Sequence, residues 1–270
     1  MTTLTTELKP RCARKVHIID RKEISFDDAS IFQEMKYNIE NHFDVYVIKN
    51  VADKGFLKQV KHYLHQLGTH SLPSYHQLQE GSPDFHRVCI NDPRSPIKST
   101  MHQYLFHPWN QNVLDLFNRL PDCFYIKNLM AGFKKDLFLN NTPKDDFIAK
   151  LVFQHYPTGG GYMMRHSDPI GEHQLVVSVL QVTTKGEDFK EGGFYVIDQD
   201  GQKLFIDDIA HAGDLLLSNG LVQHGIDPVD PGKPLDMFNE AGRWSLLAAV
   251  TKTPHNTRTP DALPIGKAIY

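Results

Sequence analysis

The order of apolar and polar positions divides the chain into a helical first part and a strand-rich second part. In the first part, apolar residues recur at the spacing of an amphipathic helix, acidic residues stand where helices begin, and Gly68 follows one of them. Apolar and aromatic residues without this period predict a strand. We therefore predict helices over 26–40, 53–67, 109–120 and 124–137, and a strand over 44–49. The last two helices are expected to pack on the outside of a sheet.

The segment 72–108 follows neither pattern. It is rich in Pro, Ser, His and aromatic residues and shows little periodicity. Long irregular segments in compact proteins are often lids or binding loops. We expect this segment to help cover a substrate, with a plain surface excursion as an equal alternative.

The second part contains short runs of β-branched, aromatic and aliphatic residues separated by turns. Such runs predict strands, and an Asp-Gly turn at 198–201 joins two of them as a hairpin. The expected strands lie at 151–156, 174–183, 191–196, 203–206, 212–217, 222–226 and 244–251. Three glycines at 159–161 predict a tight turn or a close backbone approach.

Two histidines and one aspartate among these strands suggest a metal site. Side chains two residues apart on a strand point to the same face, so His166 and Asp168 can hold one ion. His224 opens a later strand and can complete the set. Two imidazoles and a carboxylate suit non-haem Fe(II) and leave coordination positions open, although they also describe some catalytic zinc centres. A hydrogen-bonded histidine and a solvated aspartate are the plain alternative for His166 and Asp168 alone.

The strand order and these residues together resemble the 2-oxoglutarate- and Fe(II)-dependent dioxygenases. His166, Asp168 and His224 match the His-x-Asp…His motif of that superfamily, and Arg243-Trp244-Ser245 matches its Arg-x-Ser. The resemblance covers about 151–251. It implies a mainly β fold with flanking helices, in which a double-stranded β-helix (jelly-roll, cupin-like) core follows an α-rich N-terminal portion. It also implies Fe(II), 2-oxoglutarate as co-substrate, and O2.

The resemblance assigns further residues to the co-substrate. A guanidinium offers a rigid fork of donors to a carboxylate, so Arg243 would hold the distal carboxylate of 2-oxoglutarate, and Ser245 would add a hydroxyl donor. In similar enzymes the positions of two pairs on neighbouring strands also help: Gln154 with Tyr156, and Gln181 with Thr183. An ordinary half-buried sheet residue is the alternative for each member of these pairs.

Other features near the motif are expected to be structural. The separation of His224 from Arg243 is longer than usual for the superfamily, because 227–242 is rich in Pro, Gly and Asp and predicts a surface loop. An ordinary surface arginine is the alternative for Arg243. We expect no ligand role for His155, His173 and His211.

The resemblance implies an enzyme that hydroxylates an unactivated C–H bond of a small-molecule metabolite and releases succinate and CO2. Desaturation or ring formation by the same oxidant is a variant of this reaction. Two other classes stay open: a metal-dependent, cupin-like isomerase or hydrolase that needs no O2, and a non-catalytic β-barrel binding protein. The sequence identifies neither the substrate nor the oligomeric state.

Composition limits the expected partners and cellular compartment of the protein. The 270 residues carry a net charge of -3 without a basic stripe, so nucleic acid is not an expected partner. No run approaches the ~20 apolar residues that span a bilayer, and no secretory signal pattern is seen. Three widely spaced cysteines suit a reducing cytoplasm. We expect an α-rich portion with a substrate-covering loop at 1–145, the catalytic core at 146–254 and a tail at 255–270, in one compact unit.

Overall fold

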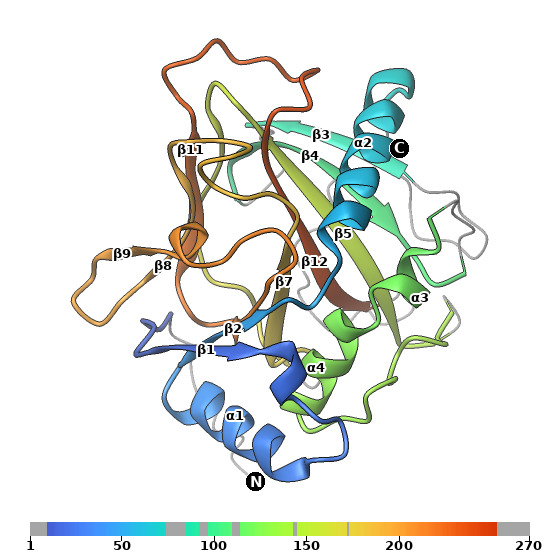
Figure 1. The fold of residues 1–270 in the computed structure, drawn as a ribbon, viewed down its shortest axis with the longest axis vertical. Helices are drawn as coiled ribbons and strands as arrows, with labels where there is room; N and C mark the ends of the chain where they lie inside the picture. The colour runs from blue at the N-terminus through green and yellow to red at the C-terminus, as the bar shows by residue number, and fades with distance from the viewer. Residues whose placement is uncertain are drawn as a thin grey trace, which may run out of the picture.

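The computed structural model describes residues 10–73, 85–91, 97–109, 114–142, 145–171 and 173–252. Its main feature is a twelve-stranded sheet (Figure 1). The helices are α1 (Ala29–Asn41), α2 (Lys54–His70), α3 (Leu116–Arg119) and α4 (Asp122–Met130), with single 3-10 turns η1 (Arg21–Glu23) and η2 (Ile206–Asp208). The strands are β1 (Val16–Asp20), β2 (Val45–Lys49), β3 (Phe85–Ile90), β4 (Ser99–Phe106), β5 (Phe147–Pro157), β6 (Gly161–His166), β7 (Val176–Gln181), β8 (Gly193–Ile197), β9 (Lys203–Phe205), β10 (Leu215–Asn219), β11 (His224–Val229) and β12 (Gly242–Lys252).

The strand order mixes segments that are distant in sequence. It runs β1-β2-β10-β7-β12-β5-β4-β6-β11-β8-β9, and β3 pairs with β4 beside this path. Only the β1–β2 pair among these is parallel. The β8–β9 hairpin projects on the left in Figure 1. This mainly β architecture, with antiparallel strands crossing between distant segments, is a double-stranded β-helix, as predicted.

Two apolar cores lie on opposite faces of the sheet. The outer core joins Phe32 of α1 and Leu57 of α2 to strand residues such as Trp244 and Leu246. The inner core contains Val47 and Leu216 from one part of the sheet, and it also contains Phe194, Val196 and Ile226 from the part formed by β6, β11 and β8. The sheet therefore folds over on itself around the inner core, since strands from its two ends contribute to one cluster.

Two of the predicted helices have the expected positions. Asp28 caps α1 by accepting from Ser30 N at 3.0 Å, and Asp53 caps α2 by accepting from Phe56 N at 2.7 Å. Helix α2 continues past Gly68 to His70, so the predicted end at the glycine was two residues early. The strand predicted at 44–49 is β2.

The other two helices are shorter than predicted. In the described part of 109–120 the helix α3 spans only Leu116–Arg119, and Asp115 before it has a left-handed backbone. Helix α4 ends at Met130, because Gly132 adopts φ +81 and turns the chain away. The prediction of helix over 131–137 was wrong. Helix α4 does pack against β7 on the outside of the sheet: the Ser178 hydroxyl donates to Cys123 O at 2.9 Å.

The prediction of an irregular segment at 72–108 was also wrong in part. Its described residues contain β3 and β4, and β4 lies inside the sheet between β5 and β6. Both faces of β4 are largely buried, so its sequence lacks the alternation that marks a half-buried strand. Residues 74–84 and 92–96 lie outside the described residues, and the substrate-covering role of this segment stays a prediction.

The loop after β11 has the surface character that its composition predicted, since most residues from 231 to 240 are exposed. It packs on the glycine turn between β5 and β6: a Cβ on Gly159, which has φ +87, would lie 2.3 Å from Pro234 O. The glycines thus serve a tight turn and a close backbone approach, as expected, and the approaching segment is this loop.

Strands β1 to β4 come from the predicted N-terminal portion and belong to the same sheet as the later strands. The boundaries proposed at 145 and 254 stay predictions, and the tail lies outside the described residues. Among the described helices, none combines the length and the apolar character that crossing a membrane requires.

Candidate metal centre

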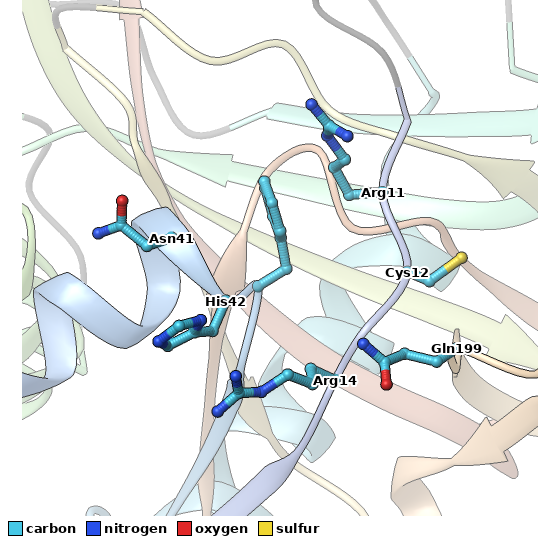
Figure 2. A pocket seen from close by; sticks show the side chains of 7 residues that line it. Arg11, Cys12, Arg14, Asn41, His42 and Gln199 are labelled. Atoms are coloured by element: carbon cyan, nitrogen blue, oxygen red, sulfur yellow. The ribbon is translucent and has the colours of Figure 1, made fainter.

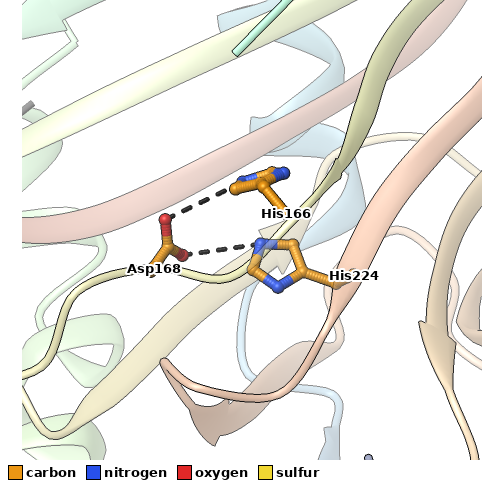
Figure 3. Close-up of side chains that lie close together, drawn as sticks. All are labelled: His166, Asp168 and His224. Atoms are coloured by element: carbon orange, nitrogen blue, oxygen red, sulfur yellow. Dashed lines mark ion pairs between the residues drawn. The ribbon is translucent and has the colours of Figure 1, made fainter. Parts of the chain in front are cut away.

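His166, Asp168 and His224 converge at one end of the inner face. His166 ends β6 and His224 begins β11, and the two residues are directly opposite each other in this antiparallel pair. Their ring centroids are 4.3 Å apart. The nitrogen Nε2 of His166 lies 3.8 Å from Asp168 Oδ1, and Nε2 of His224 lies 3.5 Å from Asp168 Oδ2 (Figure 3). Two atoms each about 2.1 Å from a shared ion are at most about 4.2 Å apart, so these separations leave room for one.

The backbone fixes the tautomer of both histidines. His166 Nδ1 lies 2.8 Å from Met164 O, and His224 Nδ1 lies 2.8 Å from Val222 O. A carbonyl only accepts, so each Nδ1 carries the proton and each Nε2 presents a lone pair. Metal-ligating histidines are oriented in this way. In the described residues this is the one group of three or more His, Cys, Asp or Glu whose ligand atoms all lie within 4.8 Å of one another.

Electrostatics also keep His166 in the form that binds a metal. Burial, followed by the neighbouring His224, lowers the pKa of His166 to about 4, so its imidazole is neutral near pH 7. Asp168 lies beyond the end of β6, and the strand-face argument for its direction was therefore wrong. A hydrogen bond from Asp168 N to Gly220 O at 2.8 Å holds it beside the turn before β11 instead.

Arg243 and Ser245 occupy the same inner face, at the start of β12. The Arg243 side chain is only 1% exposed, so the surface-arginine alternative is excluded. Its Nη1 donates to Ser245 Oγ at 3.0 Å and its Nη2 donates to Gln181 Oε1 at 2.8 Å. Two further donors contact Asp207 of η2: Nε to Oδ2 at 2.6 Å and Nη2 to Oδ1 at 3.1 Å. Arg243 is therefore a buried cation that is already paired with a carboxylate of its own chain.

Two aromatic residues connect this network to the metal centre. The Phe194 ring lies 5.6 Å from Arg243 Cζ and its centroid lies 5.7 Å from that of His224. The Tyr156 ring lies 5.9 Å from Arg243 Cζ. Burial raises the pKa of Tyr156 above its usual range; the Arg243 cation opposes this rise, and the Asp168 and Asp207 carboxylates add to it. The Arg243 network and the triad are thus neighbours on the inner face, with the Phe194 ring near both.

The structure resolves which members of the two predicted pairs face this site. In the β5–β12 register Tyr156 is opposite Arg243 and Gln154 is opposite Ser245, so both face inward. Gln181 also faces inward through its contact with Arg243. The Thr183 hydroxyl instead exchanges hydrogen bonds with the backbone N and O of Trp244, at 2.8 and 3.2 Å. This bonding is structural, and it places Thr183 outside the network of Arg243 contacts.

Sequence reasoning missed Asp207. The residue follows Phe205-Ile206 and precedes Asp208, which is the composition of a solvated turn. In the fold its side chain is buried and also accepts from Phe194 N at 2.6 Å. The pairing with Arg243 joins residues 36 positions apart, and no local pattern encodes it.

Of the other histidines near the motif, His155 and His173 have the structural surroundings that were expected, and the role of His211 stays a prediction. His155 is buried against Trp244, with ring centroids 4.1 Å apart, and its Nε2 lies 3.2 Å from Ala241 O. The His173 ring stacks on Phe147 at 4.8 Å. His211 lies beside Asp207 in the wall of a cavity of about 380 Å³.

A second cavity, of about 390 Å³, lies on the surface next to the N-terminal segment. Figure 2 shows Arg11, Cys12 and Arg14 on that segment, Asn41 and His42 at the end of α1, and Gln199 from the β8–β9 turn. Its cationic groups are partly engaged, because Arg14 Nε lies 3.3 Å from Asp44 Oδ1 and the Arg11 guanidinium lies over the Phe43 ring. This cavity shares no lining residue with the triad or the Arg243 network.

No protein-family model matches the chain, and no curated protein matches it by sequence. Solved structures do match. A full-length protein from Neurospora crassa, in complex with alpha-KG and thymine, gives a TM-score of 0.52 at 15% identity, covering 89% of this chain and 85% of the other. AtDAO1, the dioxygenase for auxin oxidation 1 from Arabidopsis thaliana, in a binary complex with 2-oxoglutarate, gives 0.51 at 13% identity over 92% and 99% of the two chains.

The chain has the fold of the 2-oxoglutarate-dependent dioxygenases. The resemblance predicted from its motifs is confirmed at the level of fold, since the similarity extends over most of each chain, including the portion before residue 146. At such low identity the comparison carries the fold alone, and activity has to be argued from the site.

Proposed function

We propose that this protein is an Fe(II)- and 2-oxoglutarate-dependent dioxygenase that hydroxylates an unactivated C–H bond of a small molecule. The observation that carries the proposal is the convergence of two Nε2 lone pairs and one carboxylate at an end of a double-stranded β-helix. Two histidines and one carboxylate are the ligand set of non-haem Fe(II) oxygenases, which keep positions open for co-substrate and O2.

Each residue has a specific task in this proposal. His166, Asp168 and His224 would hold Fe(II), and the Met164 and Val222 carbonyls would keep both imidazoles in the ligating tautomer. Bound there, Fe(II) supplies the chemistry that couples decarboxylation of 2-oxoglutarate, giving succinate and CO2, to hydroxylation of the substrate. The co-substrate would extend from the metal toward Arg243 and Ser245. Phe194 would line its path, because its ring lies near both His224 and Arg243, and Tyr156 would line the Arg243 end.

A small-molecule substrate is supported by the structural neighbours. The Neurospora crassa protein is in complex with thymine, and AtDAO1 is named for the oxidation of auxin. Both are small molecules. We therefore extend the proposal to an enclosed pocket for a metabolite, the usual form of small-molecule sites.

An anaerobic titration tests the metal and the co-substrate together. Fe(II) and 2-oxoglutarate are added to apo-protein while the weak visible metal-to-ligand charge-transfer band is followed. We expect a band that saturates in the wild type, is lost in Asp168→Ala, and is unchanged in the matched control Asp200→Ala, whose side chain is exposed. A bound metal without any band would favour the cupin-like isomerase or hydrolase, or a zinc centre, and consumption of O2 on addition of candidate substrates would then be absent as well.

A further inference from the structure

The pairing of Arg243 with Asp207 conflicts with the role that Arg243 would have toward a co-substrate. Nε and Nη2 form one of the two edges of the guanidinium that can receive a carboxylate with two parallel bonds, and Asp207 occupies that edge. A second carboxylate at one buried cation would meet like charge at close range, which is unfavourable in a site of low dielectric. With Asp207 in place, the distal carboxylate of 2-oxoglutarate would add a second negative charge beside a buried cation that Asp207 already neutralises.

We propose that Asp207 is an internal competitor that holds Arg243 in the ligand-free protein and moves toward Lys190 when the co-substrate binds. The inference rests on the proposed function. It assigns to Asp207 control over the affinity for 2-oxoglutarate, and to Lys190 the place that receives the displaced carboxylate.

The ligand-free position of Asp207 is built into the fold. Besides Arg243, the Phe194 backbone N–H donates to Asp207 Oδ2 at 2.6 Å. Gly193 makes room for the carboxylate: a Cβ at this position would lie 2.4 Å from Asp207 Oδ2. Several donors and a cleared volume thus stabilise the closed arrangement, so a ligand must displace a well-bound group.

Asp207 and two lysines line the same cavity, which offers a destination for its carboxylate. Asp207 lines the cavity of about 380 Å³ together with Lys185 and Lys190. The Lys185 ammonium already donates to Asp208 Oδ1 at 2.7 Å. No acidic side chain in the described part of the chain pairs with the ammonium of Lys190, which is exposed. Lys190 can therefore offer a new partner to Asp207 without losing another.

The Arg243 network also has a donor that lacks an acceptor. Gln181 is 1% exposed, and its Oε1 accepts from Arg243 Nη2. Its Nε2 is buried with no hydrogen-bond partner among the described residues. A buried donor without an acceptor costs about 1–3 kcal/mol, and a ligand carboxylate beside Arg243 would supply one. The ligand-free network is thus incomplete on the side where a co-substrate would bind.

The charge-transfer titration, performed with variants, tests this competition. We expect Asp207→Asn to bind 2-oxoglutarate at least tenfold more tightly than the wild type, because no carboxylate then has to be displaced. We expect Lys190→Gln to bind it several-fold more weakly, because the displaced Asp207 loses its partner. Lys58→Gln, an exposed substitution on α2 outside the cavity, is the control and should match the wild type.

Thermal unfolding gives an independent readout. Ligand-free Asp207→Asn should melt at a lower temperature than the wild type, since Arg243 loses its counter-charge, and 2-oxoglutarate should raise its Tm more than that of the wild type. Equal or weaker binding of 2-oxoglutarate by Asp207→Asn would overturn the proposal and make Asp207 a positioning residue for Arg243. If Asp207→Asn does not fold, unchanged affinity in Lys190→Gln would overturn it.

Failure of the proposed function gives a different result. In that case no variant shows the band although metal is bound, and the inference falls with it. A band that appears in Asp207→Asn but not in the wild type would support both proposals, since Asp207 would then hold the site closed.

Discussion

At the scale of single residues, the orientation of the two imidazoles in the proposed metal centre depends on contacts within their own segments. His166 and His224 each bond a carbonyl two residues earlier. Such contacts belong to the local backbone, which is why the motif alone identified both residues. Asp207 differs, because its buried environment comes from Arg243, Phe194 and Gly193, none of which is a neighbour in sequence.

Gly193 gives a prediction about this environment. Gly193→Ala places a methyl group 2.4 Å from Asp207 Oδ2 at φ +102, so both strain and a clash oppose it. We expect a loss of about 3 kcal/mol or more in the free energy of unfolding, measured with urea. Gly201→Ala is the matched control, with φ +77 and no atom within 4 Å of the added Cβ, and should cost about 1 kcal/mol. Equal losses would show that the Asp207 carboxylate does not fill this space.

Lys127 gives a prediction about pH. Lys127 belongs to α4, and its buried ammonium donates to Ala248 O at 3.0 Å. Burial, followed by Lys150, lowers its pKa to about 7. The unfolded chain binds this proton up to about pH 10.5, whereas the folded chain binds it only below about pH 7. The resulting loss of folding stability therefore grows as pH falls from about 10.5 to about 7 and is constant below pH 7. At pH 7 the free energy of unfolding of Lys127→Met, measured with urea, should therefore exceed that of the wild type by a few kcal/mol. This difference should shrink toward pH 10.

The exposed Lys58→Met is the control for this series and should leave the urea midpoint unchanged across the range. A gain for Lys127→Met that does not depend on pH would mean that packing, and not the proton, accounts for it.

At the scale of elements, the sequence predicted best where one face of a segment is buried and the other is solvated. Helices α1 and α2 have this property, and their patterns were sufficient. The β8–β9 hairpin was predicted from its Asp-Gly turn, although β8 is buried throughout. Strand β4 is largely buried on both faces, and helix α4 ends where Gly132 takes a positive φ. Neither the β4 segment nor the end of α4 is marked by a clear hydrophobic period, so the sequence predicted no strand for the first and too long a helix for the second.

Strands β3, β4 and β5 are joined by a buried histidine stack, formed by His86, His102 and His155. His86 Nε2 lies 2.7 Å from His102 Nδ1, and the His102 and His155 rings stack at 5.5 Å. Burial, followed by His102, lowers the pKa of His86 to about 4, and the same two causes place the pKa of His155 well below its ordinary value, with smaller contributions from His65 and Lys61. These histidines stay neutral in the folded protein while the unfolded chain takes up protons.

The stack predicts acid sensitivity. The contribution of these histidines to the free energy of unfolding is fully present above about pH 6.5. It is lost as pH falls toward 4, by up to about 1.4 kcal/mol per pH unit for each histidine. In urea unfolding from pH 7.5 to 4.5, His155→Phe should lose less stability than the wild type, whatever its starting value. His70→Phe is the control, because His70 is exposed at the end of α2. Parallel curves for His155→Phe and the wild type would contradict the assignment.

At the scale of the whole molecule, the proposed metal centre connects distant parts of the fold. β6 and β11 bring His166 and His224 together across 58 residues of sequence, and the hydrogen bond from Asp168 to Gly220 joins their flanking turns. A ligand that binds only this assembled arrangement stabilises the folded chain by mass action, by about 2.7 kcal/mol at a hundredfold excess over Kd.

Metal binding should therefore raise the melting temperature. We expect a saturating divalent metal, with Mn(II) as an air-stable probe, to raise the Tm of the wild type by about 5 °C or more. Asp168→Ala should show little or no increase, whereas Asp200→Ala should respond like the wild type. An equal increase in Asp168→Ala would place the metal elsewhere.

The sequence by itself indicated the strands of the core in their order along the chain, His166, Asp168 and His224 as candidate ligands, and Arg243 at the start of the last strand. These depend on turns, short motifs and strand periodicity, which short segments carry. The tertiary structure alone decided that Asp168 is placed by Gly220, that β4 enters the sheet, and that Asp207 pairs with Arg243. Each of these depends on the burial of one segment by another that is distant in the chain. The free energy of a buried charge pair is set by that environment, which no local pattern records.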